Sequence, residues 1–318
     1  MKTVLRRNLS HALRHGDLPQ AVALLDRLKL EDPLALETRG LELEFLLRAG
    51  RLAEAGALAA QLLELFPASG RVHYLAGVLA YRKKDYPRAE RHLRESLGLY
   101  PHAKTRHWLA KTLTQSGSYA EAEALLLELL PAEPRCQLDL AWLYERKQDI
   151  GRALGAVEAW LEQRPDDAWA RSQLQRLRAR TLQPEDLLEE VDSLLDLGED
   201  VAPEVLPEYL ETLLAIGQSG KARTFVQQRR HAFDARLAAR LGWVCHHRQA
   251  YDLALELFLI AFAENRRNFK FLAALETAAS RCNRLPELIA LYEKQAAEEK
   301  TLYGRIKTLR RRVEERRP

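Results

Sequence analysis

Two groups of residues carry side chains that bind metal ions in other proteins. Cys245, His246 and His247 are adjacent in sequence, and His11 and His15 are four residues apart. Adjacent residues of a helix point about 100° apart, so the first group does not converge on one ion. The second group has the spacing of two helical ligands, but no third ligand is evident near it. We therefore expect structural or surface roles for both groups, and we predict no metal site and no cofactor.

Catalytic patterns are also missing from the sequence. It has no glycine-rich phosphate loop, no Ser-His-Asp signature and no metal quartet. A repeat, described next, fills the whole chain and leaves no room for a separate catalytic domain. We therefore predict that the protein is not an enzyme.

The helices that carry these side chains follow from one recurring unit, which residues 77–101 show most clearly. They read GVLAYRKKDYPRAERHLRESLGLYP. Gly77 and Tyr81 fall on one predicted helix, and Ala89 falls on a second helix after a break at residues 84–85. Pro101 then ends the second helix, because proline is poorly tolerated in a helix interior. The stretch therefore predicts a helical hairpin.

A small residue is expected where the two helices approach closely, and Ala89 marks that position. The mark recurs in steps of 34, 34, 33, 31, 34, 35, 32 and 34 residues. Its members are Ala21, Ala55, Ala89, Ala122, Ala153, Leu187, Ala222, Ala254 and Leu288. Prolines follow five of these residues by twelve positions, and glycines precede four of them by five positions (Pro33, Pro67, Pro101, Pro134 and Pro165; Gly16, Gly50, Gly117 and Gly217). Glycine there accepts the left-handed conformation that closes a helix, so two independent marks on one period predict a repeat solenoid.

With these residues the unit resembles the tetratricopeptide repeat (TPR), a helical hairpin of about 34 residues. The resemblance covers nearly the whole chain and implies an all-α, right-handed superhelical solenoid of about nine TPR-like hairpins. We predict five regular repeats in residues 1–165, a divergent repeat with an acidic linker in 166–202, three further repeats in 203–299 and a basic C-terminal capping helix in 300–318. Residues 198–203 are the predicted irregular linker, and a hinge or a change of curvature, if the array has one, is expected there.

The resemblance also implies which side chains line the concave face of the solenoid. Residues eleven positions before the register mark include two tryptophans, and residues seven positions before it are mostly arginines. Tryptophan supplies a large contact area, and arginine supplies forked donors for carboxylates. An extended or helical protein segment, and in particular an acidic one, would fit such a groove. The predicted partner-binding residues are Trp142, Trp243, Tyr74, Tyr81, Arg48, Arg82, Lys111, Arg146 and His246.

Both side-chain types have a structural explanation as well. The arginines lie at the C-terminal ends of the first helices, where the helix dipole favours a cation. Some aromatic residues of the first helices must be core residues wedged between neighbouring hairpins. Spacing alone does not separate these explanations from partner binding.

Charge is distributed unevenly along the chain. No Lys or Arg occurs from Leu182 to Thr212, which holds eleven acidic residues, whereas residues 300–318 hold eight basic and two acidic ones. The net charge of +4 therefore divides into +6 for this tail and −2 for the other 299 residues. The tail reads as an amphipathic helix, which we expect to cap the last repeat. Three alternatives are contact with anionic lipid, contact with nucleic-acid phosphate, and docking on the acidic stretch.

Composition limits the remaining possibilities. Hydrophobic residues make up 47% of the 318 residues, and no apolar run approaches the roughly 18 residues of a membrane span. The N-terminus lacks the apolar core of a signal peptide, so we predict a cytoplasmic location. Cys136, Cys245 and Cys282 are odd in number and far apart, which argues against a disulfide framework. The high content of Leu, Ala and Arg favours a bacterial source.

Together these patterns predict a non-catalytic scaffold or adaptor that holds a segment of a partner protein in its concave face. Two alternatives stay open. One is a nucleic-acid-binding helical repeat protein, against which the acidic middle of the chain argues. The other is a helper subunit of an enzyme or of an envelope-assembly complex, with weak membrane-surface contact through the tail. The sequence does not predict the oligomeric state.

Overall fold

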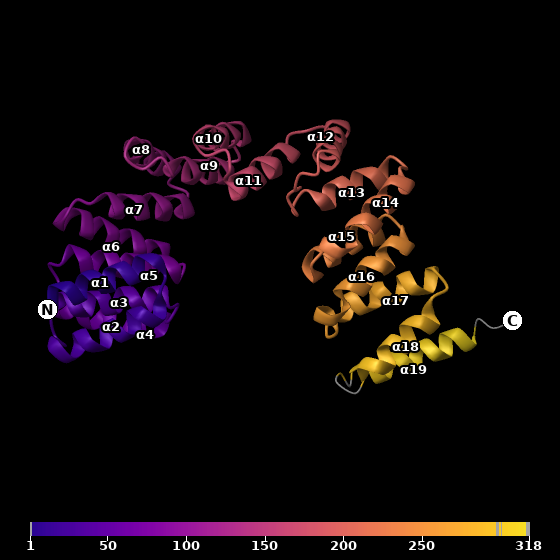
Figure 1. The fold of residues 1–318 in the computed structure, drawn as a ribbon, viewed down its shortest axis with the longest axis horizontal. Helices are drawn as coiled ribbons and strands as arrows, with labels where there is room; N and C mark the ends of the chain where they lie inside the picture. The colour runs from indigo at the N-terminus through magenta and orange to yellow at the C-terminus, as the bar shows by residue number, and fades with distance from the viewer. Residues whose placement is uncertain (1, 297–298, 300, 316–318) are drawn as a thin grey trace. The chain divides into compact units, whose positions relative to one another are not determined.

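The computed structural model describes residues 2–296, 299 and 301–315, and this part of the chain is helical throughout (Figure 1). It contains nineteen α-helices and one short 3-10 helix, without a strand among the described residues. The α-helices pair in chain order into nine hairpins, and α19 follows the ninth. This confirms the predicted all-α helical repeat solenoid and its number of hairpins. The predicted handedness and the predicted boundaries at residues 165, 202 and 299 stay predictions.

The chain divides into two compact units, Met1–Ala170 and Arg171–Pro318. Unit 1 holds α1 (Lys2–His15), α2 (Leu18–Glu31), α3 (Leu36–Arg48), α4 (Leu52–Leu65), α5 (Gly70–Arg82), α6 (Tyr86–Leu99), α7 (Ala103–Ser116), α8 (Tyr119–Leu129), α9 (Cys136–Arg146), α10 (Ile150–Gln163) and the start of α11 (Ala168–Ala179). Unit 2 holds the rest of α11, α12 (Pro184–Asp196), α13 (Leu206–Ala215), α14 (Ser219–Arg229), η1 (Arg230–Ala232), α15 (Ala235–His247), α16 (Tyr251–Asn265), α17 (Phe269–Arg281), α18 (Leu285–Ala296) and α19 (Thr301–Glu314).

In eight of the nine hairpins, the turn between the two helices is closed by one residue with left-handed backbone geometry. The four predicted glycines have φ values of +74°, +72°, +86° and +79° at Gly16, Gly50, Gly117 and Gly217. Four other hairpins adopt the same geometry without glycine, at Lys84, Gln148, Gln249 and Asn283. The prediction for the glycines is therefore confirmed. The turn keeps its shape without glycine because the packing of the two helices over-determines it.

The distance between the two helices of a hairpin depends on the residue twelve positions before the register mark. This residue faces the residue four positions after the register mark. We call its place the closing position. Gly77 and Gly242 hold this position in the two most closely packed hairpins, α5–α6 and α15–α16. A Cβ atom on Gly77 would lie 2.6 Å from Leu93 Cγ, and one on Gly242 would lie 2.6 Å from Phe258 Cδ1. In these two hairpins glycine therefore lets a large side chain of the second helix touch the backbone of the first.

Two hairpins carry a polar residue at this closing position and are the most loosely packed. Gln175 holds it in α11–α12, and Glu276 holds it in α17–α18. Gln175 Nε2 donates to the Asp200 carbonyl (3.1 Å), and the Ala202 amide donates to Gln175 Oε1 (2.7 Å). These bonds fix the irregular stretch 198–203, in which Ala202 is buried. The hinge or change of curvature that the sequence places here stays a prediction.

Helix α19 packs against the end of unit 2. Leu302, Ile306 and Leu309 are buried in the same hydrophobic core as α17 and α18. Arg305 Nη1 lies 2.6 Å from Glu276 Oε1, and both side chains are largely buried. The described part of the tail thus covers the ninth hairpin, whereas Lys300, Arg316 and Arg317 lie outside the described residues.

None of the helices that the structure describes is both long and apolar enough to cross a membrane.

Candidate interaction surface

One set of helices in unit 1 forms a continuous surface. The consecutive first helices α1, α3, α5, α7 and α9 contact each other, whereas the described second helices make no comparable contacts among themselves. Because the first helices are closer together, unit 1 curves with these helices on its inner side. We call their exposed surface the first-helix face. It carries the predicted residues Arg48, Tyr74, Tyr81, Arg82, Lys111, Trp142 and Arg146.

Aromatic side chains form the middle of this face. The Tyr81 ring meets the Trp108 ring edge-on, with 5.2 Å between the ring centroids, so α5 and α7 are joined by this contact. Tyr74 and Trp108 are half-buried against the core of unit 1. Burial raises the pKa of the Tyr74 phenol, and the charge of Glu44 raises it further. The three rings therefore combine core packing with partial exposure, and Trp142 on α9 is half-buried as well.

The basic residues of the face have partners within the chain. Arg82 Nη1 donates to the carbonyl of Leu47, in the last turn of α3. Arg48 and Arg71 each lie 3.6 Å from a carboxylate oxygen of Glu44. This arrangement supports the structural explanation for Arg82, although the carbonyl that it reaches belongs to the preceding hairpin rather than to its own helix. The side chain of Arg146 is exposed.

Lys111 takes part in a small polar network between α7 and α9. Its Nζ lies 3.2 Å from Asp139 Oδ1 and 5.8 Å from the centroid of the Trp108 ring. His107 Nε2 lies 2.7 Å from Asp139 Oδ2. Burial alone would raise the pKa of Asp139, but the His107 hydrogen bond and the Lys111 charge together hold that pKa below its usual value. Asp139 is thus an anion that holds the His107 and Lys111 side chains in place between α7 and α9.

Sequence reasoning did not include His107 and Asp139, because each residue on its own is unremarkable. Their spacing of 32 residues, close to one repeat, is the signal that could have paired them. It also left out Trp169, whose side chain at the start of α11 is 59% exposed. Trp169 lies eighteen positions before the register mark of its hairpin, and only positions eleven and seven were considered. It borders a cleft of about 630 Å³ together with Trp160, Arg135 and Arg164.

The two remaining predicted residues, Trp243 and His246, belong to unit 2 and lie in an aromatic cluster on α15. Trp243 packs edge-on against Phe258, with 5.5 Å between the centroids, and is half-buried. His246 packs edge-on against Tyr251 at 5.6 Å, and both of its ring nitrogens are buried without a hydrogen-bond partner among the described residues. Burial, together with His247, lowers the pKa of His246. The cluster holds a neutral imidazole among aromatic rings.

The described residues contain no metal-binding group, and two of the cysteines are buried. No group of three or more His, Cys, Asp or Glu side chains there lies close enough to hold a metal ion. The His11 and His15 rings lie against each other on α1, with 4.3 Å between their centroids and an angle of 40° between their planes. Cys136 and Cys245 are free and buried, and burial raises the pKa of Cys245 to about 12. Such a thiol stays protonated and unreactive at neutral pH.

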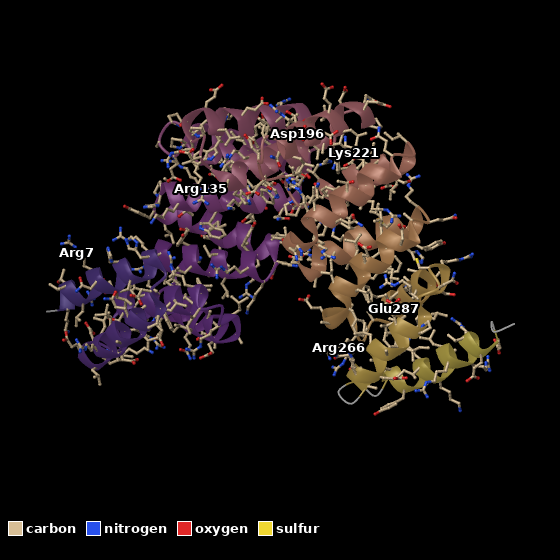
Figure 2. All side chains as sticks on the ribbon, turned by 45° about the vertical axis from the view of Figure 1, so that its right-hand side comes forward. Arg7, Arg135, Asp196, Lys221, Arg266 and Glu287 are labelled. Atoms are coloured by element: carbon tan, nitrogen blue, oxygen red, sulfur yellow. The ribbon has the colours of Figure 1, made fainter. Side chains whose placement is uncertain are left out.

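Charged side chains outside this face are mostly exposed. Arg7 on α1 projects away from the ribbon (Figure 2). Lys221 on α14 forms an ion pair with Asp192 of the acidic stretch. Glu211 of the same stretch pairs with Arg248 at 2.9 Å. Cations of unit 2 thus neutralise part of the acidic stretch.

Comparison with known proteins identifies the repeat. Two tetratricopeptide repeat family models match the chain, one over residues 9–69 and 45–104 and the other over residues 80–136. No curated protein matches the sequence.

Three solved structures illustrate the likeness. The APC/C hetero-tetramer Cut9–Hcn1 shares 13% identity and a TM-score of 0.51 over 86% of this chain, which spans 55% of the length of that one. A thermophilic TPR protein of Thermus thermophilus shares 21% identity over 56% of this chain and 98% of its own, with a TM-score of 0.49. A tetratricopeptide repeat protein of Parabacteroides merdae shares 14% identity over 87% of this chain and 98% of its own, with a TM-score of 0.45. At these identities, the likeness to Cut9–Hcn1 supports the fold alone.

Proposed function

The chain is a tetratricopeptide repeat protein, and on this basis we propose that it is a non-catalytic scaffold that binds a segment of a partner protein on the first-helix face of unit 1. Repeat arrays of this kind commonly bind partners on an extended concave surface. The observation that carries the proposal is the row of half-buried rings formed by Tyr74, Trp108 and Tyr81 on helices that contact each other. Clustered aromatic residues with partial exposure are typical anchors of protein interfaces.

The chemistry of the partner follows from what surrounds these rings. The cations of the face are already paired, Arg48 with Glu44 and Lys111 with Asp139. An acidic partner must therefore exchange such pairs. The Arg48–Glu44 pair is the more exposed of the two, and pairs of this kind contribute only about 0–1 kcal/mol. We propose a segment with an apolar or aromatic anchor and flanking carboxylates. The bacterial source and the cytoplasmic location are likewise proposals.

The test is an affinity purification with the full chain after nuclease treatment, using two variants of the face. Tyr81→Ala and Trp142→Ala each remove a half-buried ring, and Tyr100→Ala is the matched control because Tyr100 is 64% exposed at the end of a second helix. We expect a discrete protein that the wild type and Tyr100→Ala retain and that the Tyr81→Ala/Trp142→Ala double variant loses.

Two outcomes contradict the proposal. One is a partner that the double variant retains as well as the wild type does. The other is recovery of nucleic acid alone when nuclease is omitted, which would favour the nucleic-acid-binding alternative. Circular dichroism of each variant checks that the helices are still formed.

A further inference from the structure

We propose that the cleft between α18 and α19 binds an acidic amphipathic helix of a partner protein, and that this helix takes the place of the second helix of a tenth hairpin. This surface lies in unit 2 and is independent of the first-helix face.

The register of α19 is the first step. Ile306, Leu309 and Val313 follow Leu272, Leu275 and Ala279 of α17 by one 34-residue period. The three residues of α17 are buried, as are Ile306 and Leu309, and Val313 packs against the same core. Helix α19 is therefore the first helix of a tenth unit. The described residues provide no second helix to cover its other side.

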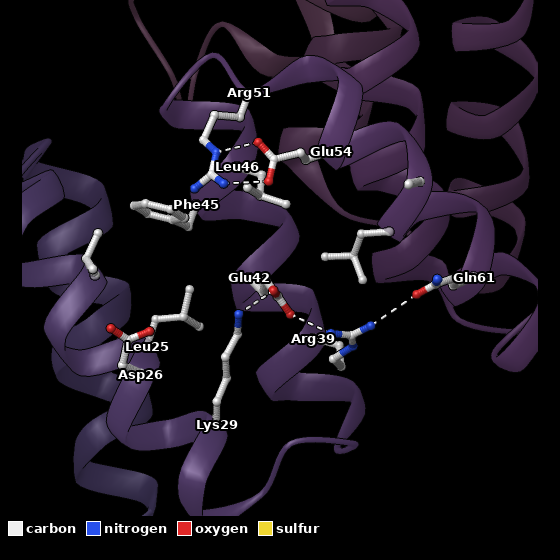
Figure 3. A pocket seen from close by; sticks show the side chains of 13 residues that line it. Leu25, Asp26, Lys29, Arg39, Glu42, Phe45, Leu46, Arg51, Glu54 and Gln61 are labelled. Carbon is white, nitrogen blue, oxygen red and sulfur yellow. Dashed lines mark hydrogen bonds and ion pairs between the residues drawn. The ribbon is translucent and has the colours of Figure 1, made fainter.

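The cleft between α2, α3 and α4 shows what a complete junction looks like (Figure 3). Its walls include Asp26 and Lys29 from a second helix and Arg39 from the next first helix. Helix α4 closes it as the third wall, and Gln61 Oε1 on α4 accepts a hydrogen bond from Arg39 Nη2 (3.1 Å). The remaining cleft measures about 400 Å³. The second helix thus fills the junction and supplies an acceptor to a cation of the first helix.

The cleft at α18 and α19 is bounded in the same way by a second helix and the next first helix. No following second helix among the described residues closes it. Glu293 and Ala296 hold the register positions of Asp26 and Lys29, and Ile306 holds that of Arg39. The cleft measures about 820 Å³, roughly twice the volume at the complete junction. Tyr303 on its rim is 58% exposed. An apolar floor of Ala296 and Ile306 with an exposed tyrosine is suited to the apolar side of a helix.

The charges of the cleft define the polar side of the ligand. Lys307, Arg310 and Arg311 line it, and Lys307 has no carboxylate partner among the described residues. Arg310 pairs with Glu293 at 2.6 Å and Arg311 with Glu315 at 3.2 Å, but all four of these side chains are exposed. Exposed pairs are weak and exchange readily. A helix in the place of α4 would therefore find three cations whose carboxylate partners are absent or exposed among the described residues.

An anionic membrane fits this site less well than a helix does. Ile306 is 7% exposed and lies on the floor of the cleft, so it cannot insert into a bilayer. Glu293 and Glu314 line the same cleft and interrupt its basic rim, whereas an anionic membrane presents a uniform negative charge. A mixed set of charges around an apolar floor favours one partner with matching positions over a uniformly charged surface.

The test is a binding titration followed by fluorescence anisotropy, with the full chain and a stapled, labelled peptide of residues 184–196. This sequence, PEDLLEEVDSLLD, has six acidic residues and forms the amphipathic helix α12, in which Leu187, Leu188 and Val191 are buried. We expect saturable binding and a Kd several-fold higher for Lys307→Glu and for Arg311→Glu, because each replaces an exposed attraction with a repulsion, and the weakening should fade with added salt. A scrambled peptide of the same composition should bind at least several-fold more weakly.

Arg312→Glu is the matched control, since Arg312 is exposed on the same helix but does not line the cleft. It should leave Kd within about twofold of the wild type. Tyr81→Ala/Trp142→Ala should also leave Kd unchanged, which separates this site from the first-helix face. Three results would overturn the proposal: no saturation with any acidic peptide, equal weakening by Arg312→Glu, or flotation with phosphatidylserine-containing vesicles in place of peptide binding.

Discussion

Hairpins 3 (α5–α6) and 8 (α15–α16) are closely packed, whereas hairpins 6 (α11–α12) and 9 (α17–α18) are loosely packed. Glycine at the closing position of hairpins 3 and 8 lets Leu93 and Phe258 touch the facing backbone, so each of these hairpins closes on itself. Gln175 and Glu276 hold the other two hairpins open. The open hairpins use the polar side chain to bind the segment that follows, residues 200–202 in one case and α19 in the other. In these four hairpins, glycine at this register position goes with close packing of the two helices, and a polar residue goes with bonds to the segment that follows.

The largest expected effect concerns the open hairpin 9. Arg305→Ala leaves the buried carboxylate of Glu276 without its cation, and an unpaired buried charge costs about 3–5 kcal/mol. Glu276 is 9% exposed, so water does not readily replace the arginine. Urea unfolding of unit 2 should show this loss, and the Glu276→Ala/Arg305→Ala double variant should recover most of it.

Arg310→Ala is the control for that loss, because the Arg310–Glu293 pair is exposed. It should cost less than about 1 kcal/mol. A loss for Arg305→Ala no greater than that for Arg310→Ala would show that α19 is held by its apolar residues alone.

The next effect is a pH dependence in the closed hairpin 3. His73 Nε2 donates to the Pro67 carbonyl (2.9 Å), and its Nδ1 lies 3.3 Å from Nδ1 of the buried His92. Burial, with His73, Arg91 and Arg88, lowers the pKa of His92 from 6.5 to about 4, against a weaker opposing charge at Glu95. Between these pH values the unfolded chain binds a proton that the folded chain does not. The free energy of unfolding should therefore be constant above pH 6.5 and fall by about 2–3 kcal/mol on going down to pH 4.

His92→Leu tests this assignment, since Leu58 occupies the same register position in hairpin 2 and is buried. The free energy of unfolding, measured by urea titration at a series of pH values, should lose this part of its pH dependence in the variant. An unchanged pH profile would contradict the role of His92.

A third, smaller effect concerns glycine itself. Gly242→Ala places a Cβ atom 2.6 Å from the Phe258 ring, which must move or push the helices apart. Overpacking of this kind costs about 1–3 kcal/mol. Gly155→Ala is the matched control, because nothing lies within 4 Å of its Cβ position in α10. There alanine should stabilise the helix by about 0.5–1 kcal/mol, and thermal unfolding of the two variants should shift in opposite directions.

The smallest effect concerns the open hairpin 6. Gln175→Ala removes two hydrogen bonds to the stretch 200–202, and each contributes about 0.5–1.5 kcal/mol. Hydrogen exchange of the Ala202 amide should accelerate in the variant. Unchanged exchange would mean that burial alone orders this stretch.

Much of the fold could be predicted from the sequence because its marks are local. A proline ends a helix and a glycine closes a turn wherever they occur, so Pro101 and Gly117 place their elements without knowledge of distant residues. The same holds for Ala89, which needs only the facing helix of its own hairpin. Periodicity then extends these local statements along the chain.

The surface was less predictable because its chemistry depends on pairs of residues. Spacing places Arg82 and Lys111 on the first helices, but the Leu47 carbonyl and Asp139 that they contact belong to neighbouring hairpins. The pair of Glu276 and Arg305 joins residues 29 positions apart on different helices, and neither residue suggests the other. Partner binding by the predicted residues stays a prediction that the proposed experiments address.

The alternation of closed and open hairpins has a mechanical consequence. Pulled from its two ends, the chain would not stretch as a uniform spring, because hairpins 3 and 8 resist separation through direct contact between helix backbone and side chain. Hairpins 6 and 9 lack that contact, so their helices are held by the shared hydrophobic core and by the bonds of one polar side chain each. These two joints would yield first and lengthen the array while the closed hairpins keep their shape.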